Sequence, residues 1–231
     1  MTTSSIDLNA DLGEGLTDDM GLLAVVTSAN VACGYHAGDE RMMRKVCAVA
    51  ARSGVSVGAQ VSYNDRPNFG RVARDVSFKV LSEQIADQVG TLTRIARKEG
   101  ATVRYVKPHG ALYHRVYDDP EQAQALLEGS GDLPVLGMEG ALILDRARAA
   151  GRRTFHEGFP DRAYTPDGRL VPRGKPGALI TDIDEVGRRA VEMAARVDSI
   201  CVRGDRPTVL SVAREVRRAL TAAGFELRSL A

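Results

Sequence analysis

The chain has 231 residues, of which 44% are hydrophobic and 26% are charged, and its formal net charge is +1 at pH 7. This composition is typical of a globular protein, and the length allows a substantial buried core. Nucleic acid is not expected as a partner, because no block of lysine and arginine is interleaved with aromatic residues. A membrane segment is not expected either, since no apolar run reaches the roughly 20 residues of a spanning helix.

The N-terminus and the cysteines both favour a cytoplasmic protein. Residues 1–5 lack the basic and apolar regions of a signal peptide, and Asp7 follows almost at once. Cys33, Cys47 and Cys201 are odd in number and far apart, which favours reduced thiols. No Cys-x-x-Cys or His-x-x-x-His spacing indicates a structural zinc site.

Strand-like runs recur along the chain, and polar turns follow them. Residues 6–11 alternate like a short strand and run into a turn that carries carboxylates. A second unit begins at Leu22–Val26 and continues through small and polar residues to Asp39, with two glycines bracketing His36. The remaining strands are expected at residues 55–59, 103–106, 133–136, 153–156 and 200–202.

Amphipathic helices are expected between these strands. Asp39 and Ser77 can cap the first two, and Asp119-Pro120 starts a later one. Apolar residues recur at spacings of three and four from Phe78 to Ile95, which makes this the clearest helix. The helices are expected between residues 39 and 54, 77 and 100, 119 and 127, 141 and 151, 186 and 197, and 209 and 220, with a small hairpin over residues 165–172.

The alternation of about seven strands with about six helices requires a largely parallel sheet. Such a sheet can stay open and doubly wound, or it can close into a barrel related to the (β/α)₈ type. Nearly every expected strand ends in a polar turn, whereas an open sheet concentrates its ligand groups at one switch point. We therefore predict one α/β domain over residues 1–231, a (β/α) barrel with about seven parallel strands.

The stretch Val106–Tyr113 carries the most distinctive chemistry in the chain. It follows a strand-like run and places Lys107, a proline, His109 and Gly110 in consecutive positions. The proline forces Lys107 out of helical geometry, and Gly110 permits backbone conformations that other residues resist. The strand should therefore present a cation and an imidazole at its carboxyl end, where α/β proteins bind ligands. A tight turn with a solvated lysine and histidine is the alternative.

Polar groups at the other strand ends should converge on this stretch. They combine acid/base candidates with cations that suit phosphate or a substrate carboxylate, and carboxylates that suit Mg²⁺. No nucleophile elbow or Walker A loop accompanies them. The converging groups are Asn9, Asp11, Glu14, His36, Asp39, Asp65, Arg71, Lys107, His109, Glu157, Asp161, Arg162, Arg203 and Asp205.

Several of these residues also have a purely structural interpretation. Asp39 can be a helix cap only, and Arg71 or Arg162 can be a surface residue paired to a neighbour. The other histidines, His114 and His156, stand outside the constellation and are interpreted as structural or solvated. Cys33 and Cys201 are interpreted as small core residues rather than nucleophiles.

Four sequence runs closely resemble the LamB/YcsF family: DLNADLGE at 7–14, SANVACGYHAGD at 28–39, VKPHGALY at 106–113 and DRAY at 161–164. The resemblance extends over essentially the whole chain. It implies a seven-stranded barrel similar to the glycoside hydrolase/deacetylase barrels. The family is described as the A subunit of bacterial 5-oxoprolinase, so the resemblance also implies ATP-dependent opening of 5-oxoproline to L-glutamate. ATP, with Mg²⁺, and two further subunits, B and C, are expected with it.

This reaction suggests a role for each candidate residue. Lys107 and Arg162 would stabilise phosphoryl charge, and Asp11, Glu14 or Asp161 would hold Mg²⁺. His36 or His109 would donate or accept a proton. The catalytic candidates are Asp11, Glu14, His36, Lys107, His109 and Asp161. The candidates for binding substrate or phosphate are Asn9, Asn30, Asp39, Arg71, Arg162 and Asp205.

Two positions depart from the family pattern. Gln60 stands where members often have a histidine after the third strand, and Arg203 stands where they usually have a histidine before Gly-Asp. Neither replacement can transfer a proton at neutral pH. The loss counts against an alternative function, a metal-dependent hydrolase of the deacetylase kind. It also leaves open a second alternative, a diverged subunit that binds but does not catalyse.

Overall fold

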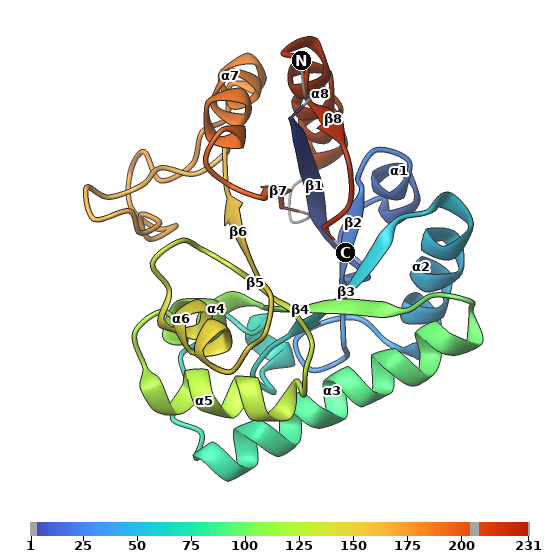
Figure 1. Ribbon diagram of the computed structural model, residues 1–231, viewed down its shortest axis with the longest axis vertical. Helices are drawn as coiled ribbons and strands as arrows, with labels where there is room; N and C mark the ends of the chain where they lie inside the picture. The colour runs from blue at the N-terminus through green and yellow to red at the C-terminus, as the bar shows by residue number, and fades with distance from the viewer. Residues whose placement is uncertain (1–3, 204–207, 231) are drawn as a thin grey trace.

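A parallel β-barrel forms the centre of the computed structural model, which describes residues 4–203 and 208–230 (Figure 1). Strands β1 to β7 are neighbours in chain order, and β1 pairs in parallel with both β2 and β7, which closes the barrel. The predicted barrel of about seven parallel strands is therefore confirmed. The strands are β1 Ser5–Leu12, β2 Ser28–Ala32, β3 Ser56–Val61, β4 Val103–Pro108, β5 Val135–Gly137, β6 Thr154–Gly158 and β7 Ser199–Val202.

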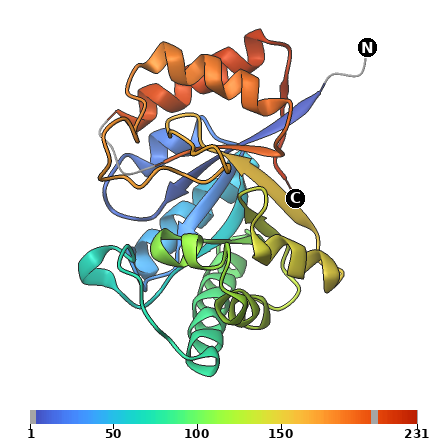
Figure 2. The same cartoon turned by 90° about the vertical axis from the view of Figure 1, so that its left-hand side faces the viewer.

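Helices surround the barrel. In Figures 1 and 2, α7 and α8 lie side by side at one end of the molecule, and α3 packs along α5 at the other. Among the described residues, no helix combines the length and hydrophobicity that crossing a membrane requires. The helices are α1 Asp19–Leu23, α2 Glu40–Ser53, the 3₁₀ turn η1 Arg66–Asn68, α3 Phe78–Lys98, α4 Gly110–Arg115, α5 Pro120–Gly129, α6 Leu142–Ala149, α7 Ile183–Ala194 and α8 Val209–Ala222.

The structure differs from the expected elements in a few places. The second strand is β2, whereas Leu22 and Leu23 are the buried end of the short helix α1, which Asp18 caps through the Gly21 amide. The helix α4 and the two-residue strand β8, Glu226–Leu227, which pairs with β1, were not expected. The hairpin at 165–172 is reduced to a turn and one isolated bridge, between Tyr164 and Leu170.

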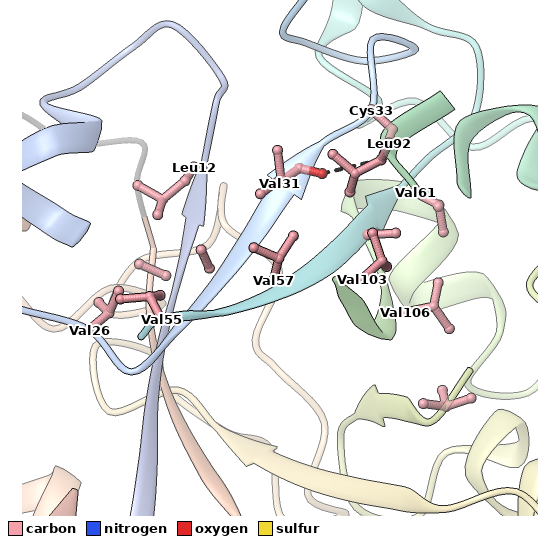
Figure 3. Packing of buried hydrophobic residues seen from close by; sticks show 14 of the residues in the cluster. Leu12, Val26, Val31, Cys33, Val55, Val57, Val61, Leu92, Val103 and Val106 are labelled. Atoms are coloured by element: carbon pink, nitrogen blue, oxygen red, sulfur yellow. Dashed lines mark hydrogen bonds between the residues drawn. The ribbon is translucent and has the colours of Figure 1, made fainter. Parts of the chain in front are cut away.

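Side chains alternate between the two faces of the barrel wall, as they must in a strand. On β1 the apolar residues, such as Leu8 and Ala10, are buried beneath the helices. The valines of β2, β3 and β4 join them in the same core, which includes Leu92 of α3 (Figure 3). Asp7 and Asn9 of β1 are buried too, and they face the interior of the barrel with the partly exposed Asp11. The core therefore lies between wall and helices, and the barrel interior is polar.

Asp7 is a buried carboxylic acid of this interior. Its carboxylate accepts hydrogen bonds from the hydroxyls of Thr27 at 2.7 Å and Ser28 at 2.6 Å, and from that of Ser199. Burial raises the pKa of Asp7 to about 6, although these hydrogen bonds lower it.

The shift at Asp7 predicts a stability that depends on pH. The unfolded chain releases this proton near its ordinary pKa of 3.8, whereas the folded chain holds it up to about 6. The free energy of unfolding should therefore fall by about 3 kcal/mol as pH rises through this window. Replacement of Asp7 with Asn removes the titration, so urea unfolding of the wild type and of Asp7→Asn should diverge between about pH 4 and pH 7. If the free energy of unfolding changes with pH to the same extent in the wild type and in Asp7→Asn, the burial argument is contradicted.

Candidate active site

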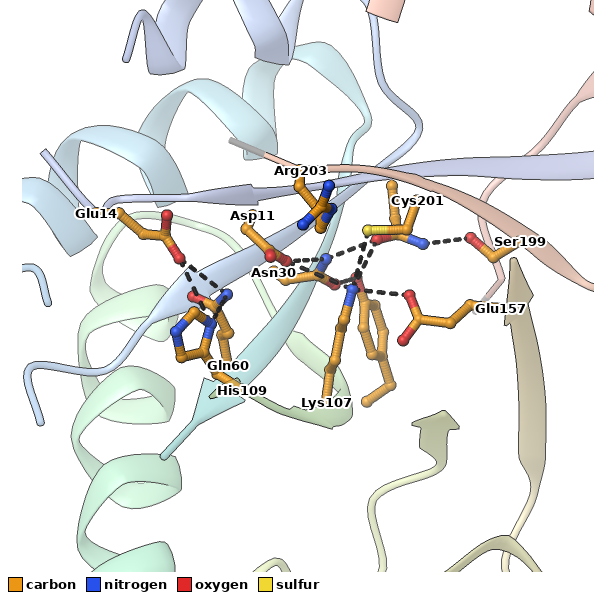
Figure 4. A network of polar contacts seen from close by, with 12 residues as sticks. Asp11, Glu14, Asn30, Gln60, Lys107, His109, Glu157, Ser199, Cys201 and Arg203 are labelled. Carbon is orange, nitrogen blue, oxygen red and sulfur yellow. Dashed lines mark hydrogen bonds and ion pairs between the residues drawn. The ribbon is translucent and has the colours of Figure 1, made fainter. Parts of the chain in front are cut away.

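Lys107 lies at the carboxyl end of β4 and points into the barrel, where it is 3% exposed (Figure 4). Its Nζ lies 2.7 Å from Glu157 Oε2 and 3.4 Å from Asp11 Oδ1. It also donates to Asn9 Oδ1 and Cys201 Sγ, each at 3.2 Å. Strands β1, β6 and β7 thus supply the partners of a lysine from β4, and the closure of the barrel brings them together.

The charges around Lys107 keep its ammonium protonated. Burial by itself would lower the pKa of Lys107, but Asp11, Cys201 and Glu157 raise it well above its usual value. Burial raises the pKa of Glu157, and the Lys107 ammonium opposes this. The result is a fixed cation at the bottom of the site, held in one position by its neighbours.

The Asn30 amide and the Tyr105 phenol hold the partners of Lys107 in position. The Asn30 amide donates to Asn9 Oδ1 at 2.7 Å and to Asp11 Oδ1 at 2.9 Å, and it accepts from the Tyr105 hydroxyl at 2.6 Å. The Tyr105 ring fits because residue 58 is glycine, since a Cβ there would lie 2.2 Å from the ring. Asn9 and Asn30 are therefore buried orienting groups.

A second cluster lies beside the first, at the ends of β1, β2, β3 and β4. The Gln60 amide nitrogen lies 3.0 Å from Glu14 Oε1 and 3.0 Å from His109 Nδ1 (Figure 4). The rings of His36 and His109 stack with centroids 4.0 Å apart, and Phe69 packs edge-on against both. Glu14 Oε1 lies 3.7 Å from one nitrogen of each imidazole.

Burial dominates the protonation of this second cluster. It raises the pKa of Glu14 and, together with the neighbouring His36, lowers the pKa of His109 well below its usual value. His109 is therefore neutral at pH 7. Both of its ring nitrogens have partners, because Nε2 lies 3.1 Å from the Phe69 carbonyl oxygen. Proton transfer by His109 would require one of these contacts to open.

A cavity of about 340 Å³ opens above Lys107 at the carboxyl ends of the strands. Asp11 and His109 line it, and so do aromatic groups such as Tyr113 and Phe159. Burial and the arginines around the cavity lower the pKa of His114, which also lines it. The cationic side chains of the described lining are Arg71, Lys107, Arg162, Arg173 and Arg203. Carboxylates pair with Lys107 and Arg203, but the cations still outnumber the carboxylates, so the cavity favours an anionic ligand.

Gly110 joins the two halves of the site. Its φ is +61°, and a Cβ at this position would lie 2.3 Å from the Gly70 carbonyl oxygen, which accepts a hydrogen bond from the Ala111 amide at 2.8 Å. This close approach fixes the loop that carries Phe69 and Arg71 against the start of α4. The unusual turn after Lys107 thus shapes one wall of the cavity.

The remaining described residues predicted for the site lie outside the Lys107 and His109 clusters. Asp161 pairs with the Arg203 guanidinium at 2.5 Å, and both are largely buried. Arg162 donates to the backbone carbonyls of Val171 and Ala178, so it holds the loop after β6 while it lines the cavity. Asp39 is exposed and caps α2 through the Met42 amide at 2.8 Å. Asp205 lies outside the described residues.

Comparison with known proteins identifies the family of this chain. The model of the LamB/YcsF family matches residues 6–231. This chain belongs to the LamB/YcsF family. Its relatives include proteins named as the A subunit of 5-oxoprolinase: one from Streptomyces griseus is 51% identical over 98% of this chain and 100% of its own length. Another, from Mycolicibacterium gilvum, is 45% identical over 98% of this chain and 99% of its own length.

Solved structures share the fold of this chain. A lactam utilization protein from Thermus thermophilus superposes with a TM-score of 0.91 at 35% identity, over 98% of this chain and 100% of that one. A family 4 carbohydrate esterase from Streptomyces lividans superposes with a TM-score of 0.55 at 11% identity, over 99% and 93%. The second likeness shows the barrel alone and gives no support to the deacetylase alternative.

The expected Mg²⁺ carboxylates do not gather in this LamB/YcsF protein. Asp11 contacts Lys107, Asp161 contacts Arg203, and Glu14 lies in the imidazole cluster. Asp11 is the carboxylate among the described residues of the cavity lining. One protein carboxylate is enough when phosphate oxygens and water complete the shell, so Asp11 fits a Mg²⁺ ion that arrives with a nucleotide.

Sequence patterns miss or undervalue some residues of the site. Glu157 is among the strand-end groups, but nothing in the sequence indicates that it pairs with Lys107. Gln60 is itself part of the site, because its amide nitrogen contacts both Glu14 and His109. His114 and Arg173 also line the cavity, although the sequence patterns leave His114 outside the converging groups and do not single out Arg173.

Proposed function

We propose that this chain is the A subunit of a 5-oxoprolinase that opens the lactam of 5-oxoproline to L-glutamate with hydrolysis of ATP, acting with the B and C subunits in the cytoplasm. The observation that carries the proposal is the cavity above Lys107, whose described lining has five lysine or arginine side chains and one carboxylate. Such a lining suits a ligand with several negative charges, as phosphates and carboxylates have. The name shared by the curated relatives supports the same reaction.

The residues of the cavity suit the demands of lactam opening. An amide carbonyl is a poor electrophile, and ATP supplies the chemistry that activates it, by phosphorylation of the amide oxygen. Lys107 would stabilise the charge on that oxygen, and its position needs no reorganisation because Glu157 and Asn9 already hold it. The arginines would bind phosphate oxygens and the substrate carboxylate, and Asp11 would hold Mg²⁺.

The reconstituted complex tests this function. The purified chain, mixed with its two partner subunits, Mg²⁺, ATP and 5-oxoproline, should form glutamate and ADP in equal amounts. Omission of ATP, or of this chain, should abolish glutamate formation. Glutamate formed at the full rate without this chain, or without ATP, would overturn the proposal.

A further inference from the structure

Three potential metal ligands converge in the second cluster, beside the cavity that His109 also lines. One oxygen of Glu14 and one nitrogen each of His36 and His109 lie within 4.8 Å of one another, and all three residues are buried. The Glu14 oxygen is 3.7 Å from each imidazole nitrogen. Ligand atoms that share a tetrahedral Zn²⁺ ion lie about 3.4 Å apart. The planes of the two imidazoles are only 15° from parallel, so metal binding would turn one ring as well as draw the three residues slightly closer.

The surroundings of His109 orient it for such a role. Its Nε2 lies 3.1 Å from the Phe69 carbonyl oxygen, which can only accept, so this nitrogen carries the proton. The lone pair of Nδ1 is therefore directed at Glu14 and Gln60. A backbone carbonyl that fixes the tautomer of a histidine in this way is a regular feature of metal-binding imidazoles.

His36 supplies an independent observation. It is 0% exposed, and neither of its ring nitrogens has a hydrogen-bond partner. Its Nε2 lies 3.7 Å from Glu14 Oε1. A fully buried imidazole without hydrogen bonds is costly unless another partner, such as a metal ion, satisfies it.

Gln60 completes the cluster. Its amide nitrogen donates to Glu14 and His109, while its Oε1 is buried and has no partner. Rotation of the terminal amide would exchange the two atoms and direct the carbonyl oxygen at the same point. The amide would then change from a donor that links two ligand atoms to a ligand itself.

We propose that Glu14, His36 and His109 bind one divalent transition-metal ion of the Zn²⁺ class, with the Gln60 carbonyl oxygen as a fourth ligand. Imidazole nitrogens select this class over Mg²⁺, which prefers oxygen ligands. The site is thus distinct from the Mg²⁺ that would accompany ATP at Asp11. It does not depend on the proposed reaction, and it can be tested on the chain without substrate or partner subunits.

Metal binding can be measured directly. Dialysis of the purified chain against Zn²⁺ should leave one equivalent bound, and Co²⁺ should give the intense visible absorption of a four-coordinate site. Competition with a chelating dye should show that His36→Asn weakens Zn²⁺ binding roughly 100-fold or more. Gln60→His should strengthen binding roughly tenfold, because imidazole is the better ligand. His156→Asn is the matched control and should leave affinity unchanged, since His156 lies outside the cluster, beside Arg148.

Two results would overturn the site. One is Zn²⁺ binding by the wild type that is no tighter than binding by a folded His36→Asn variant. The other is an X-ray absorption spectrum of the Zn²⁺-loaded wild type without two imidazole ligands. The spectrum needs no substitution, so it decides the question even if His36→Asn fails to fold.

Discussion

Replacement of Lys107 with methionine should reduce the kcat/KM for glutamate formation by roughly 100- to 1,000-fold in the reconstituted complex. This is the usual cost of removing one preorganised group that stabilises developing negative charge. Methionine keeps much of the length of the side chain but removes the ammonium that contacts Glu157 and Asp11. Lys98→Met, at an exposed position in the last turn of α3, is the matched control and should keep full activity.

The same substitution should also destabilise the fold. Without the ammonium, the fully buried Glu157 carboxylate loses its partner, which typically costs about 3–5 kcal/mol. The double variant Lys107→Met/Glu157→Gln removes both charges, so its free energy of unfolding should recover most of this loss. Urea unfolding of the two variants separates the electrostatic cost from the loss of activity. A single variant as stable as the wild type would contradict the role of the ammonium in the barrel interior.

Gly110→Ala should be the most damaging conservative change in the loop above Lys107. Alanine at φ +61° costs about 1–2 kcal/mol, and its Cβ would lie 2.3 Å from the Gly70 carbonyl oxygen. That oxygen belongs to the backbone and is held by the Ala111 amide, so it cannot move without displacing the loop of Phe69 and Arg71. We expect a loss of at least about 3 kcal/mol in the free energy of unfolding, together with a loss of activity.

Gly131→Ala separates the close approach from the backbone conformation. Gly131 has nearly the same φ, +58°, but a Cβ there meets no atom within 4 Å. It should cost only about 1–2 kcal/mol, as strain in the left-handed region does. Equal losses for the two variants, measured by thermal or urea unfolding, would show that the contact with Gly70 contributes nothing.

The sequence predicts the barrel well because its signals are local. The cap at Asp39, the periodicity from Phe78 to Ile95 and the polar turn after each strand are all found in the structure. The helix α1 escapes prediction because a short apolar run such as Leu22–Val26 suits a strand as well as a helix. The strand β8 pairs through two residues only, too few to form a pattern.

The interior of the barrel illustrates what local patterns do not contain. Alternation of Asp7, Asn9 and Asp11 with apolar residues ordinarily indicates a strand with one face in water. In the closed barrel this polar face is buried, and it holds Lys107 in place. Likewise, the choice of Glu157 as partner of Lys107 depends on the register of strands far apart in the chain. Such pairings follow from closure of the sheet, which no single segment specifies.

The most direct test of the central claim uses the stability-matched variant Lys107→Met/Glu157→Gln in the complete complex. It addresses the alternative that this chain only binds or organises its partners. Co-elution of the variant with the partner subunits establishes assembly, and glutamate and ADP are then measured together in the presence of 5-oxoproline. The account predicts a complex that assembles but forms both products roughly 100- to 1,000-fold more slowly than the wild type. An assembled complex that forms both at the wild-type rate would contradict it.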